Sequence, residues 1–417
     1  MTLSYGSCQF PTLGFVVDRY FRVKNFVPEP FWGIKVVQKR DGKTVTFSWS
    51  RGSLFDRASV IVLFERCLLA KMAKVTKVQE KPTSKWKPLP LTTLEFQKLA
   101  TRFLRMTGAE AMKVAEGLYQ KGFISYPRTE TDRFDKGMNL RALCDKQTPD
   151  TRWGQFAQNL VNGAFQQPRQ GRHDDKAHPP IHPITYAPSV LNVNEKRVYE
   201  FVARRFLACC SEDAKGMATD IEIAYGDELF GAHGVVVLER NYLDVYPYDK
   251  WEGTAELPKF TRGEQFEPTE AMITEGKTSA PSYLTEADLL ALMDANGIGT
   301  DATMADHIEK IQMRDYVGTH QREGARGLKE FIPTGLGVAL IEGFDKMNFE
   351  TSLAKPFLRK EMELKMKAIC NGRTTKQAVL HESLAQYRHV FDESQEQLNV
   401  LKAVREPFRR HALCHDS

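Results

Sequence analysis

The sequence predicts a multidomain α+β protein, mainly helical, in which the chain passes twice through one β-rich domain. The first observation is length, because 417 residues exceed the roughly 250–300 that one hydrophobic core serves. The second is a pair of β-like blocks, Trp32 to Val78 and Met217 to Met272, with a helical pattern between them. The third is composition, since 42% hydrophobic and 27% charged residues are typical of globular proteins and exclude collagen, coiled coil and wholesale disorder.

Charge and targeting signals restrict the cellular setting. The net charge of +5 permits a polyanionic partner without requiring one. The first ten residues lack the basic and apolar regions of a secretory signal, and no stretch approaches the roughly 20 apolar residues of a membrane span. Seven cysteines without a C-x-x-C pair favour reduced thiols over a disulfide framework or a zinc ribbon. We expect an intracellular protein that does not enter a membrane.

Both β blocks show strand signals. In the first block, apolar and polar residues alternate from Val45 to Trp49, and Asp41-Gly42 is a hairpin signal. The second block contains three apolar stretches, at residues 221–223, 235–238 and 242–246. If the two blocks pair in one sheet, the chain can close into a ring.

Helices are predicted before, between and after these blocks. An apolar periodic run from Leu13 to Phe21 stops before Pro28, which a helix does not continue through. Thr107 to Glu110 form a capping box, and the helix that follows ends at Gly122. The end of this helix places residues 123–127 in a loop.

The order of elements after Pro281 resembles a winged helix. A helix from Thr285 to Gly297 and a short turn precede a second helix, from about Thr303 to Met313. A candidate hairpin runs from Tyr316 to Pro333 around residues 324–327. Helix, turn, helix and two-stranded wing is an arrangement that many nucleic-acid-binding proteins use.

The segment ISYPRTET, residues 124–131, concentrates groups suited to phosphoryl chemistry. Pro127 keeps the backbone extended, and residues two apart then share a face, so Tyr126 and Arg128 are expected to point the same way. A phenol with an ordinary pKa of about 10 is a poor nucleophile, but a neighbouring guanidinium favours the phenolate and can bind phosphate. The alternative is structural: a core tyrosine and an arginine paired with Glu130.

Three histidines, His173, His178 and His182, form a second cluster. Zinc binding is one interpretation, but Pro179 and Pro180 prevent the helix that would place His178 and His182 on one face, and no second cluster completes four ligands. A proline-bounded loop that presents imidazoles to a phosphate is the more economical interpretation. A solvated loop without a chemical role stays open.

Lys85, Trp86 and Lys87 interleave an aromatic ring with cations, a pattern suited to stacking on the bases of a single strand. A short linker can have the same composition. The sequence contains no dinucleotide fingerprint, no phosphate-cradling G-x-x-x-x-G-K and no G-x-S-x-G elbow, so nucleotide-driven chemistry is not supported.

The segment ISYPRTET resembles the active-site signature of the type IA DNA topoisomerases, and further segments resemble that family's motifs in the same order. They are SYGSCQFPTLG (residues 4–14), AHPPIHP (177–183), NYLDVYPY (241–248) and GIGTDAT (297–303). The spelling is closest to the eukaryotic topoisomerase III branch, alpha type. The resemblance runs from about Ser4 to residue 400.

The resemblance implies a toroidal fold with mainly helical domains and a β-rich arch that the chain traverses twice. The implied domains are a helical base with a winged-helix-like element (1–32 and 281–403), the arch (33–92 and 215–280) and a helical domain bearing the tyrosine (93–214). The tail, residues 404–417, resembles nothing we can place.

The resemblance also implies roles for individual residues. Tyr126 would be the nucleophile that forms a 5′-phosphotyrosyl link, Arg128 would position the scissile phosphate, and His178 would contact it near the leaving 3′ oxygen. Gln9 would line the path of the single strand. The candidate DNA contacts are Ser7, Gln9, Lys85, Trp86, Thr129, His182, Thr300 and Thr303.

The implied activity is ATP-independent cleavage of one DNA strand, passage of a second strand and religation, in DNA topology, recombination and repair. The implied partners are single-stranded DNA, a RecQ-family helicase and an OB-fold protein. The implied location is the nucleus, with mitochondria as an additional site.

Two departures from the family pattern matter. Ser7 stands where many bacterial members have Arg, which removes a phosphate contact. The family's Toprim domain, whose acidic residues bind magnesium, should precede Ser4 and has no counterpart here, so magnesium is implied without ligands in this chain. We expect the chain to bind single-stranded DNA but to relax supercoiled plasmid poorly. Two rivals stay open: a non-catalytic nucleic-acid-binding module, and a zinc hydrolase built on His173, His178 and His182.

Overall fold

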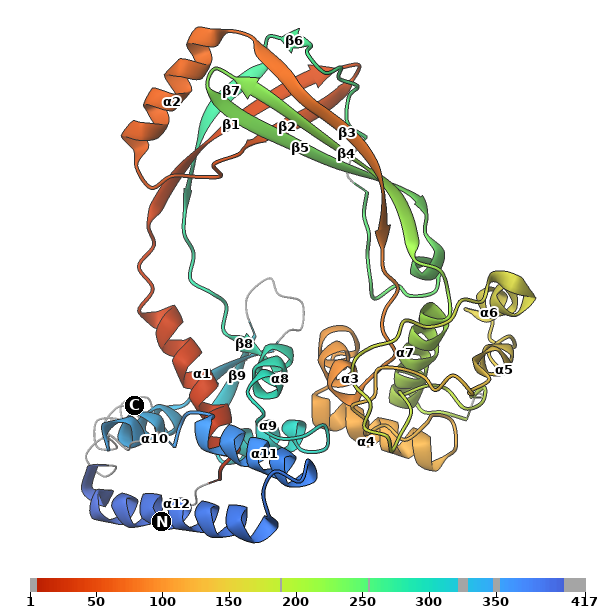
Figure 1. Cartoon of the computed structure of the whole chain (residues 1–417), viewed down its shortest axis with the longest axis vertical. Coiled ribbons are helices and arrows are strands. Elements are labelled where there is room, and N and C mark those ends of the chain that lie inside the picture. Colours follow the sequence, from red (N-terminus) through yellow and green to blue (C-terminus); the bar gives the residue numbers. More distant parts are fainter. Residues whose placement is uncertain (1–5, 188–189, 254–255, 322–328, 348–352, 401–417) are drawn as a thin grey trace, which may run out of the picture.

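The structure is a computed structural model, and it describes residues 6–187, 190–253, 256–321, 329–347 and 353–400. The described chain forms a ring in which a curved sheet spans one side and two groups of helices close the other (Figure 1). No helix in these ranges has the length and apolar character that crossing a bilayer requires.

The sheet, which we call the arch together with its one helix, has seven antiparallel strands in the order β6-β3-β4-β5-β2-β1-β7. The strands are β1 (Pro30–Arg40), β2 (Lys43–Trp49), β3 (Ala73–Lys85), β4 (Ala214–Tyr225), β5 (Glu228–Glu239), β6 (Gln265–Phe266) and β7 (Glu270–Lys277). The predicted turn Asp41-Gly42 joins β1 to β2 with positive φ at both residues (51° and 72°). The two β blocks join where Trp49 of β2 pairs with Phe230 of β5. The sequence-based expectation that the chain passes twice through one β domain is confirmed.

The arch has its own hydrophobic core. From Val45 to Trp49 buried and exposed residues alternate, as expected for a strand with one covered face. The Phe47 ring is fully buried and packs against Phe260 and Phe266, with ring centroids 5.7 and 6.2 Å away. Burial of these rings makes the arch an independently packed unit.

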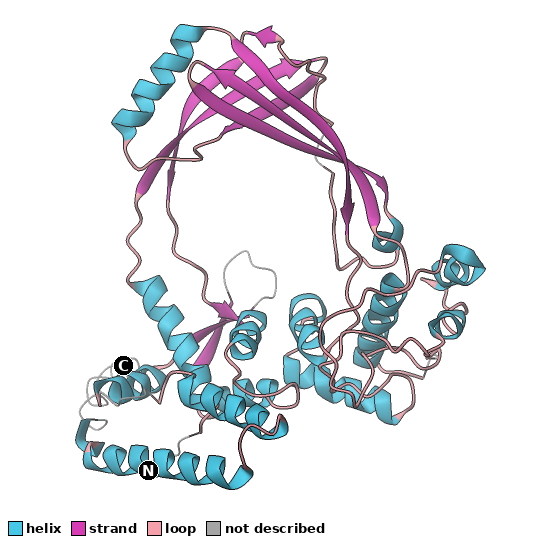
Figure 2. Ribbon diagram, in the orientation of Figure 1, coloured by secondary structure: helices cyan, strands magenta, loops and turns pink. Residues whose placement is uncertain are grey.

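One helix of the arch, α2 (Arg57–Ala70), contradicts the prediction of β structure from Trp32 to Val78. The run Val60-Ile61-Val62 is β-branched and favours a strand in isolation. However, the Asp56 carboxylate accepts hydrogen bonds from two N–H groups of the first turn (3.1 and 3.2 Å) and so caps a helix. The helix covers one edge of the sheet (Figure 2).

The second group of elements, which we call the helical unit, lies between the two passages through the arch. It contains α3 (Thr93–Leu99), α4 (Gly108–Gln120), α5 (Leu140–Asp145), α6 (Gly154–Asn159) and α7 (Val193–Cys209), with π-helical turns at Ala100–Leu104 and Leu160–Ala164. The predicted capping box is confirmed, because Thr107 and Glu110 exchange side-chain and backbone hydrogen bonds. The core forms around α7, where Phe201 and Phe206 are buried.

Residues 242–246 were predicted as part of the second β block, and this is wrong. They form a 3₁₀ turn, Asn241–Asp244, followed by a loop that packs into the core of the helical unit. Tyr242 and Tyr246 are spaced four apart, which suits a helical turn, and the Tyr246 ring lies 6.3 Å from the Phe201 ring of α7, centroid to centroid, tilted by 50°. The chain therefore leaves the sheet after β5 and returns to it at β6.

The third group, which we call the base, contains α1 and everything after β7. Its elements are α1 (Gln9–Lys24), β8 (Leu284–Thr285), α8 (Glu286–Ala295), α9 (Met304–Met313), β9 (Val317–Gln321), β10 (Lys329–Pro333), α10 (Gly335–Lys346), α11 (Phe357–Cys370) and α12 (Lys376–Glu396). The two predicted helices are confirmed, and β9 and β10 pair as the predicted hairpin, with β8 as a third strand. The predicted turn at 324–327 and the tail 404–417 lie outside the described residues.

The helical unit and the base are each joined by backbone only to the arch, and they meet through side chains. We call this meeting the gate: Gly108 and Arg128 of the helical unit contact Glu286 and Ala302 of the base. Beside these contacts α3 packs against α8. Each group has a separate buried cluster, while the exact domain limits stay predictions.

Candidate active site at the gate

The tyrosine segment, residues 124–131, is extended and is tied to the histidine loop, residues 173–185. Ile124 forms a β-bridge with Pro183. The Ser125 N–H donates to the His182 carbonyl (2.9 Å), and the His182 N–H donates to the Ser125 hydroxyl (3.0 Å). Backbone pairing therefore sets the register between the two segments.

The Tyr126 ring is half-buried between two other rings. Its centroid lies 5.2 Å from that of Tyr119 on α4, nearly perpendicular, and 4.7 Å from that of His178. The His178 side chain is exposed. The structure therefore brings together the two residues that sequence reasoning had named as nucleophile and phosphate contact.

Arg128 bridges the gate. Its Nε donates to the Glu116 carboxylate at 2.7 Å, and Nη1 donates to the Ala302 carbonyl in the segment GIGTDAT. Glu116 and Tyr119 are three apart on α4 and share a face, so Tyr126 and Arg128 both turn toward α4, as their spacing predicts. The alternative pairing of Arg128 with Glu130 is wrong, because Glu116 is the carboxylate that Arg128 contacts.

Thr129 is buried at the junction of the tyrosine segment and the histidine loop. Its side chain has no exposed area, and its hydroxyl donates to Asp175 (3.1 Å) and lies 3.3 Å from the His178 carbonyl. Its N–H donates to Thr93 Oγ1 at 2.7 Å, where α3 begins. The role of Thr129 as a DNA contact stays a prediction; in this structure its polar atoms hold the segment to α3 and to the histidine loop.

His182 is also buried, and its role as a DNA contact stays a prediction. It is 1% exposed, its ring packs edge-on against Phe134, and its Nδ1 lies 2.7 Å from the Pro180 carbonyl. Burial lowers the pKa of His182, so the ring is neutral and its Nδ1–H donates to that carbonyl. His182 stabilises the loop that carries His178.

The zinc-hydrolase rival fails on geometry. His173 pairs through Nδ1 with Asp132 (2.9 Å), whereas His182 is buried in the core of the helical unit and His178 stacks on Tyr126. Within the described ranges, no three His, Cys, Asp or Glu side chains gather as a possible metal site. The three histidines therefore have different neighbours and do not form one metal site.

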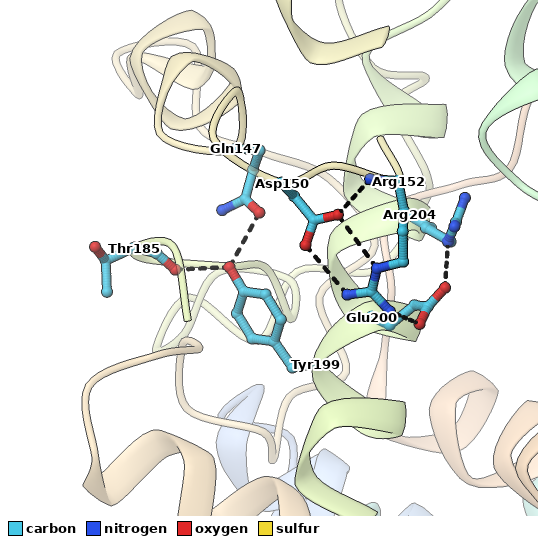
Figure 3. Close-up of polar contacts among 7 residues, drawn as sticks. All are labelled: Gln147, Asp150, Arg152, Thr185, Tyr199, Glu200 and Arg204. Carbon is cyan, nitrogen blue, oxygen red and sulfur yellow. Dashed lines mark hydrogen bonds and ion pairs between the residues drawn. The ribbon is translucent and has the colours of Figure 1, made fainter. Parts of the chain in front are cut away.

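A polar network on α7 anchors the far end of the histidine loop (Figure 3). The Tyr199 hydroxyl donates to the Thr185 carbonyl (2.7 Å) and contacts Gln147 Oε1 (3.0 Å). Burial raises the pKa of Tyr199, so its hydroxyl keeps the proton that it donates. The carboxyl-terminal end of the loop is held at two points, His182 by Ser125 and Thr185 by Tyr199.

The two lysines at the end of β3 bind groups of the protein itself. The Lys85 ammonium pairs with Asp249 (2.5 Å), and the Lys87 ammonium is buried against the carbonyls of Gln167 and Ser211. Trp86 is 66% exposed, with the Arg169 guanidinium 4.7 Å from its ring centroid. Trp86 stays available for stacking, whereas an ion pair occupies the predicted contact Lys85.

The remaining predicted contacts lie in the base. Gln9, at the start of α1, accepts a hydrogen bond from Arg314 (2.7 Å), and Ser7 is half-buried just before it. Thr300 donates its N–H to Thr303 Oγ1 (3.0 Å). Thr300 lines a cavity of about 760 Å³ at the gate, which residues of the tyrosine segment and of the histidine loop also line.

The chain is similar to known proteins over most of its length. A family model described as DNA topoisomerase matches residues 1–381. The chain belongs to this family. Its relatives are topoisomerase III proteins: it is 49% identical to DNA topoisomerase 3 of Schizosaccharomyces pombe over 402 residues, and 49% identical to DNA topoisomerase 3-alpha of Homo sapiens over 392 residues. These matches cover 96% and 94% of this chain but only 64% and 38% of the relatives, so the chain spans less than two thirds of their length.

The fold agrees with that of a type IA topoisomerase. The full-length topoisomerase I of Thermotoga maritima superposes with a TM-score of 0.74 at 23% identity, over 94% of this chain and 64% of that one. The predicted toroidal topoisomerase core is confirmed.

Magnesium is implied by the resemblance to this topoisomerase family, but the described residues contain no set of side chains that would bind it. As noted for zinc, the described residues offer no group of three or more acidic, histidine or cysteine side chains that could hold a metal. We therefore derive no step through a metal from these residues.

Several site residues escaped sequence reasoning. Glu116 pairs with Arg128, Tyr119 packs on Tyr126, and Asp132 and Asp175 fix the histidine loop. The helical spacing of Glu116 and Tyr119 was a usable signal, because both lie on the face of α4 that points toward the segment after its end. The contacts of Asp132 and Asp175 depend on loop geometry that spacing does not reveal.

Proposed function

We propose that this chain is the strand-cleaving core of a type IA DNA topoisomerase of the topoisomerase III kind, and that Tyr126 is its nucleophile. The observation that carries the proposal is the contact of Tyr126 with exposed His178, 4.7 Å between ring centroids, on a segment that also holds Arg128. Membership in the family and similarity to topoisomerase III proteins support the reaction class.

In the proposed reaction, the phenolic oxygen of Tyr126 attacks a phosphodiester of single-stranded DNA. The bond from that oxygen to phosphorus forms, and the bond from phosphorus to the 3′ oxygen breaks. The phenol loses a proton and the leaving 3′ oxygen gains one, and we assign the proton delivered to the leaving oxygen to His178. Religation is the reverse, so no energy from ATP is required.

Arg128 connects this chemistry to the gate. A guanidinium can bind two phosphate oxygens, which would stabilise the charge that develops on the phosphoryl group. The same guanidinium bonds to the Ala302 carbonyl of the base. A phosphate that recruits Arg128 would therefore compete with one of the polar contacts that hold the gate closed.

Covalent trapping tests the proposal. Incubation with a labelled single-stranded oligonucleotide, followed by denaturation, should give a protein–DNA adduct that Tyr126→Phe abolishes. Tyr119→Phe is the matched control, because it removes a neighbouring phenol 5.2 Å away and should leave the adduct yield within about twofold. The assay is run on the chain alone and with the metal-binding segment of a relative added in trans. Absence of adduct in both settings would favour the non-catalytic nucleic-acid-binding module.

The cellular role is proposed on the same basis. We infer action on DNA in the nucleus, with mitochondria as an additional site, in recombination and repair, with magnesium as the cofactor of the whole protein. A RecQ-family helicase and an OB-fold protein are the proposed partners. Affinity purification from cells and imaging of a tagged chain test these inferences, and purely cytoplasmic signal would contradict them.

A further inference from the structure

The carboxylate of Asp175 lies between the tyrosine segment and His178 and binds both. Its Oδ1 accepts hydrogen bonds from the N–H groups of Ala177 (2.8 Å) and His178 (2.9 Å). Its Oδ2 accepts from the Thr129 hydroxyl (3.1 Å) and from the Glu130 N–H (3.3 Å). One oxygen therefore holds the histidine loop, and the other holds the segment that carries Tyr126.

Two further contacts strengthen the same junction. The Asp175 N–H donates to the Thr131 hydroxyl (3.1 Å), and the Thr131 N–H donates to Thr129 Oγ1 (3.0 Å). The backbone on both sides of the Tyr126–His178 contact is thus cross-linked by a single side chain and two threonines.

The position of the His178 imidazole depends on this backbone. The ring is exposed, its recorded contact within the described chain is the Tyr126 ring, and no side-chain hydrogen bond to it is seen there. Because no hydrogen bond holds the ring, the position of the ring is determined by the backbone of His178. Asp175 fixes that backbone by accepting a hydrogen bond from the His178 N–H.

The chemistry of Asp175 suits a fixed anchor. Partial burial alone would raise the pKa of its carboxyl, but the hydrogen bonds from His178, Ala177, Thr131 and Thr129 outweigh burial and lower the pKa to about 2. The group is a permanent anion with four donors around it. An amide at this place would turn its own N–H₂ toward two of those donors and leave them unsatisfied.

The neighbouring Asp174 provides the contrast. Its carboxylate accepts from Arg133 (2.5 Å) and from the Lys176 N–H (2.9 Å), at the exposed edge of the loop. None of its recorded contacts reaches the tyrosine segment at residues 124–131.

We propose that Asp175 is a positioning residue that sets the distance between His178 and Tyr126 by holding the backbone of both segments. The importance of that distance for catalysis rests on the proposed function. The distance itself is a property of the structure and does not depend on that function. Asp175 touches neither the substrate nor the reacting atoms, and it acts through His178.

The test compares Asp175→Asn with the matched variant Asp174→Asn in the full chain. The first readout is the nuclear Overhauser contact between selectively labelled His178 and Tyr126 rings in deuterated protein. Asp175→Asn should abolish this contact while the melting transition persists, and Asp174→Asn should retain it. A retained contact in Asp175→Asn would overturn the proposal.

The second readout is the rate of adduct formation on single-stranded oligonucleotide, measured from pH 6 to 9. We expect a loss of tenfold or more and an altered pH profile for Asp175→Asn, and a change below twofold for Asp174→Asn. If the parent chain forms no adduct, the proposed function fails, and the ring contact still decides the role of Asp175.

Thr129→Val is the fallback variant if Asp175→Asn does not fold. It removes one of the donors to Asp175 Oδ2, and it should weaken the contact between the His178 and Tyr126 rings. An unchanged contact in the folded Thr129→Val variant would then overturn the proposal.

Discussion

The arch and the gate hold the ring together in different ways. The arch is a continuous ladder of backbone hydrogen bonds over a core in which Phe47 and Phe230 have no exposed area. The gate has no backbone connection; Leu94 of α3 packs on the core of the base, and two polar contacts, Gly108 with Glu286 and Arg128 with Ala302, lie beside a large cavity. The comparison teaches that the ring should open at the gate while the arch stays folded, since opening the gate breaks contacts made by side chains but no strand pairing.

The largest expected effect is on the arch. Phe47→Ala removes a fully buried ring that packs on Phe260 and Phe266, and should lower the free energy of unfolding by about 3–5 kcal/mol. Urea denaturation followed by tryptophan fluorescence measures it. Thr46→Ala, on the exposed face of the same strand, is the control and should change stability by about 0.5 kcal/mol or less. Equal effects of the two substitutions would show that the arch is not a packed unit.

An intermediate effect is expected from Gly108→Ala at the gate. A Cβ at residue 108 would lie 2.9 Å from a Glu286 oxygen and 3.3 Å from the Ala305 Cβ, so the Glu286 carboxylate must leave the Gly108 N–H and Ala305 must shift, at a cost of about 1–3 kcal/mol. Energy transfer between dyes on the helical unit and the base should report a larger open fraction. The matched control is Gly117→Ala on the same helix, where the nearest atom lies 4.0 Å away and the helix should gain stability. Opening in both variants would point to α4 itself rather than to the gate.

The smallest expected effect is the response of the gate to pH through Glu286. Burial, the largest cause, raises the pKa of this carboxyl to about 7 in the closed ring; Glu110 and Glu309 raise it further, whereas the Gly108 N–H and Lys329 lower it. In an open gate the pKa returns toward the ordinary value, so closing takes up a proton. The contribution of Glu286 to closure is therefore complete at low pH and is lost as pH rises through about 7.

Energy transfer should consequently show up to roughly tenfold more opening at pH 8 than at pH 6. Glu286→Gln carries no titratable group and should flatten this dependence, while Asp288→Asn on the same helix should keep it, because Asp288 is exposed. A pH response that survives Glu286→Gln would assign the titration to another group.

Local signals in the sequence predicted much of the fold. The Thr107 capping box and the Asp41-Gly42 turn are decided by neighbours within four residues, and each is present in the structure. The helix α2 was missed because its β-branched run mimics a strand, while its capping residue, Asp56, is a weaker signal than three consecutive apolar residues. In α2 the capping hydrogen bonds of Asp56 favour a helix although the apolar pattern favours a strand.

The site was predictable only where motif and geometry coincide. The rings of Tyr126 and His178 are in contact, and Arg128 contacts Glu116 and Ala302, whereas His182 and Thr129, in the same motifs, face inward. Their burial follows from contacts to residues about 50 positions away, such as the pairing of Ser125 with His182. Sequence spacing does not reveal such contacts, because loops bring them together.

The leg between the arch and the base consists of two chain segments that run side by side, whereas the leg between the arch and the helical unit contains more, because the chain also enters the core of the helical unit at Tyr242 and Tyr246 between β5 and β6. In one leg the Thr278 N–H donates to the Glu29 carbonyl (2.9 Å), and in the other the Lys87 N–H donates to Asp213 (2.8 Å). A single proteolytic nick in either leg would therefore leave the circle mechanically intact, since the uncut segment still carries the load. Limited digestion should produce nicked rings that keep their hydrodynamic radius, and a cut in both segments of the leg between the arch and the base would be needed to separate those two parts.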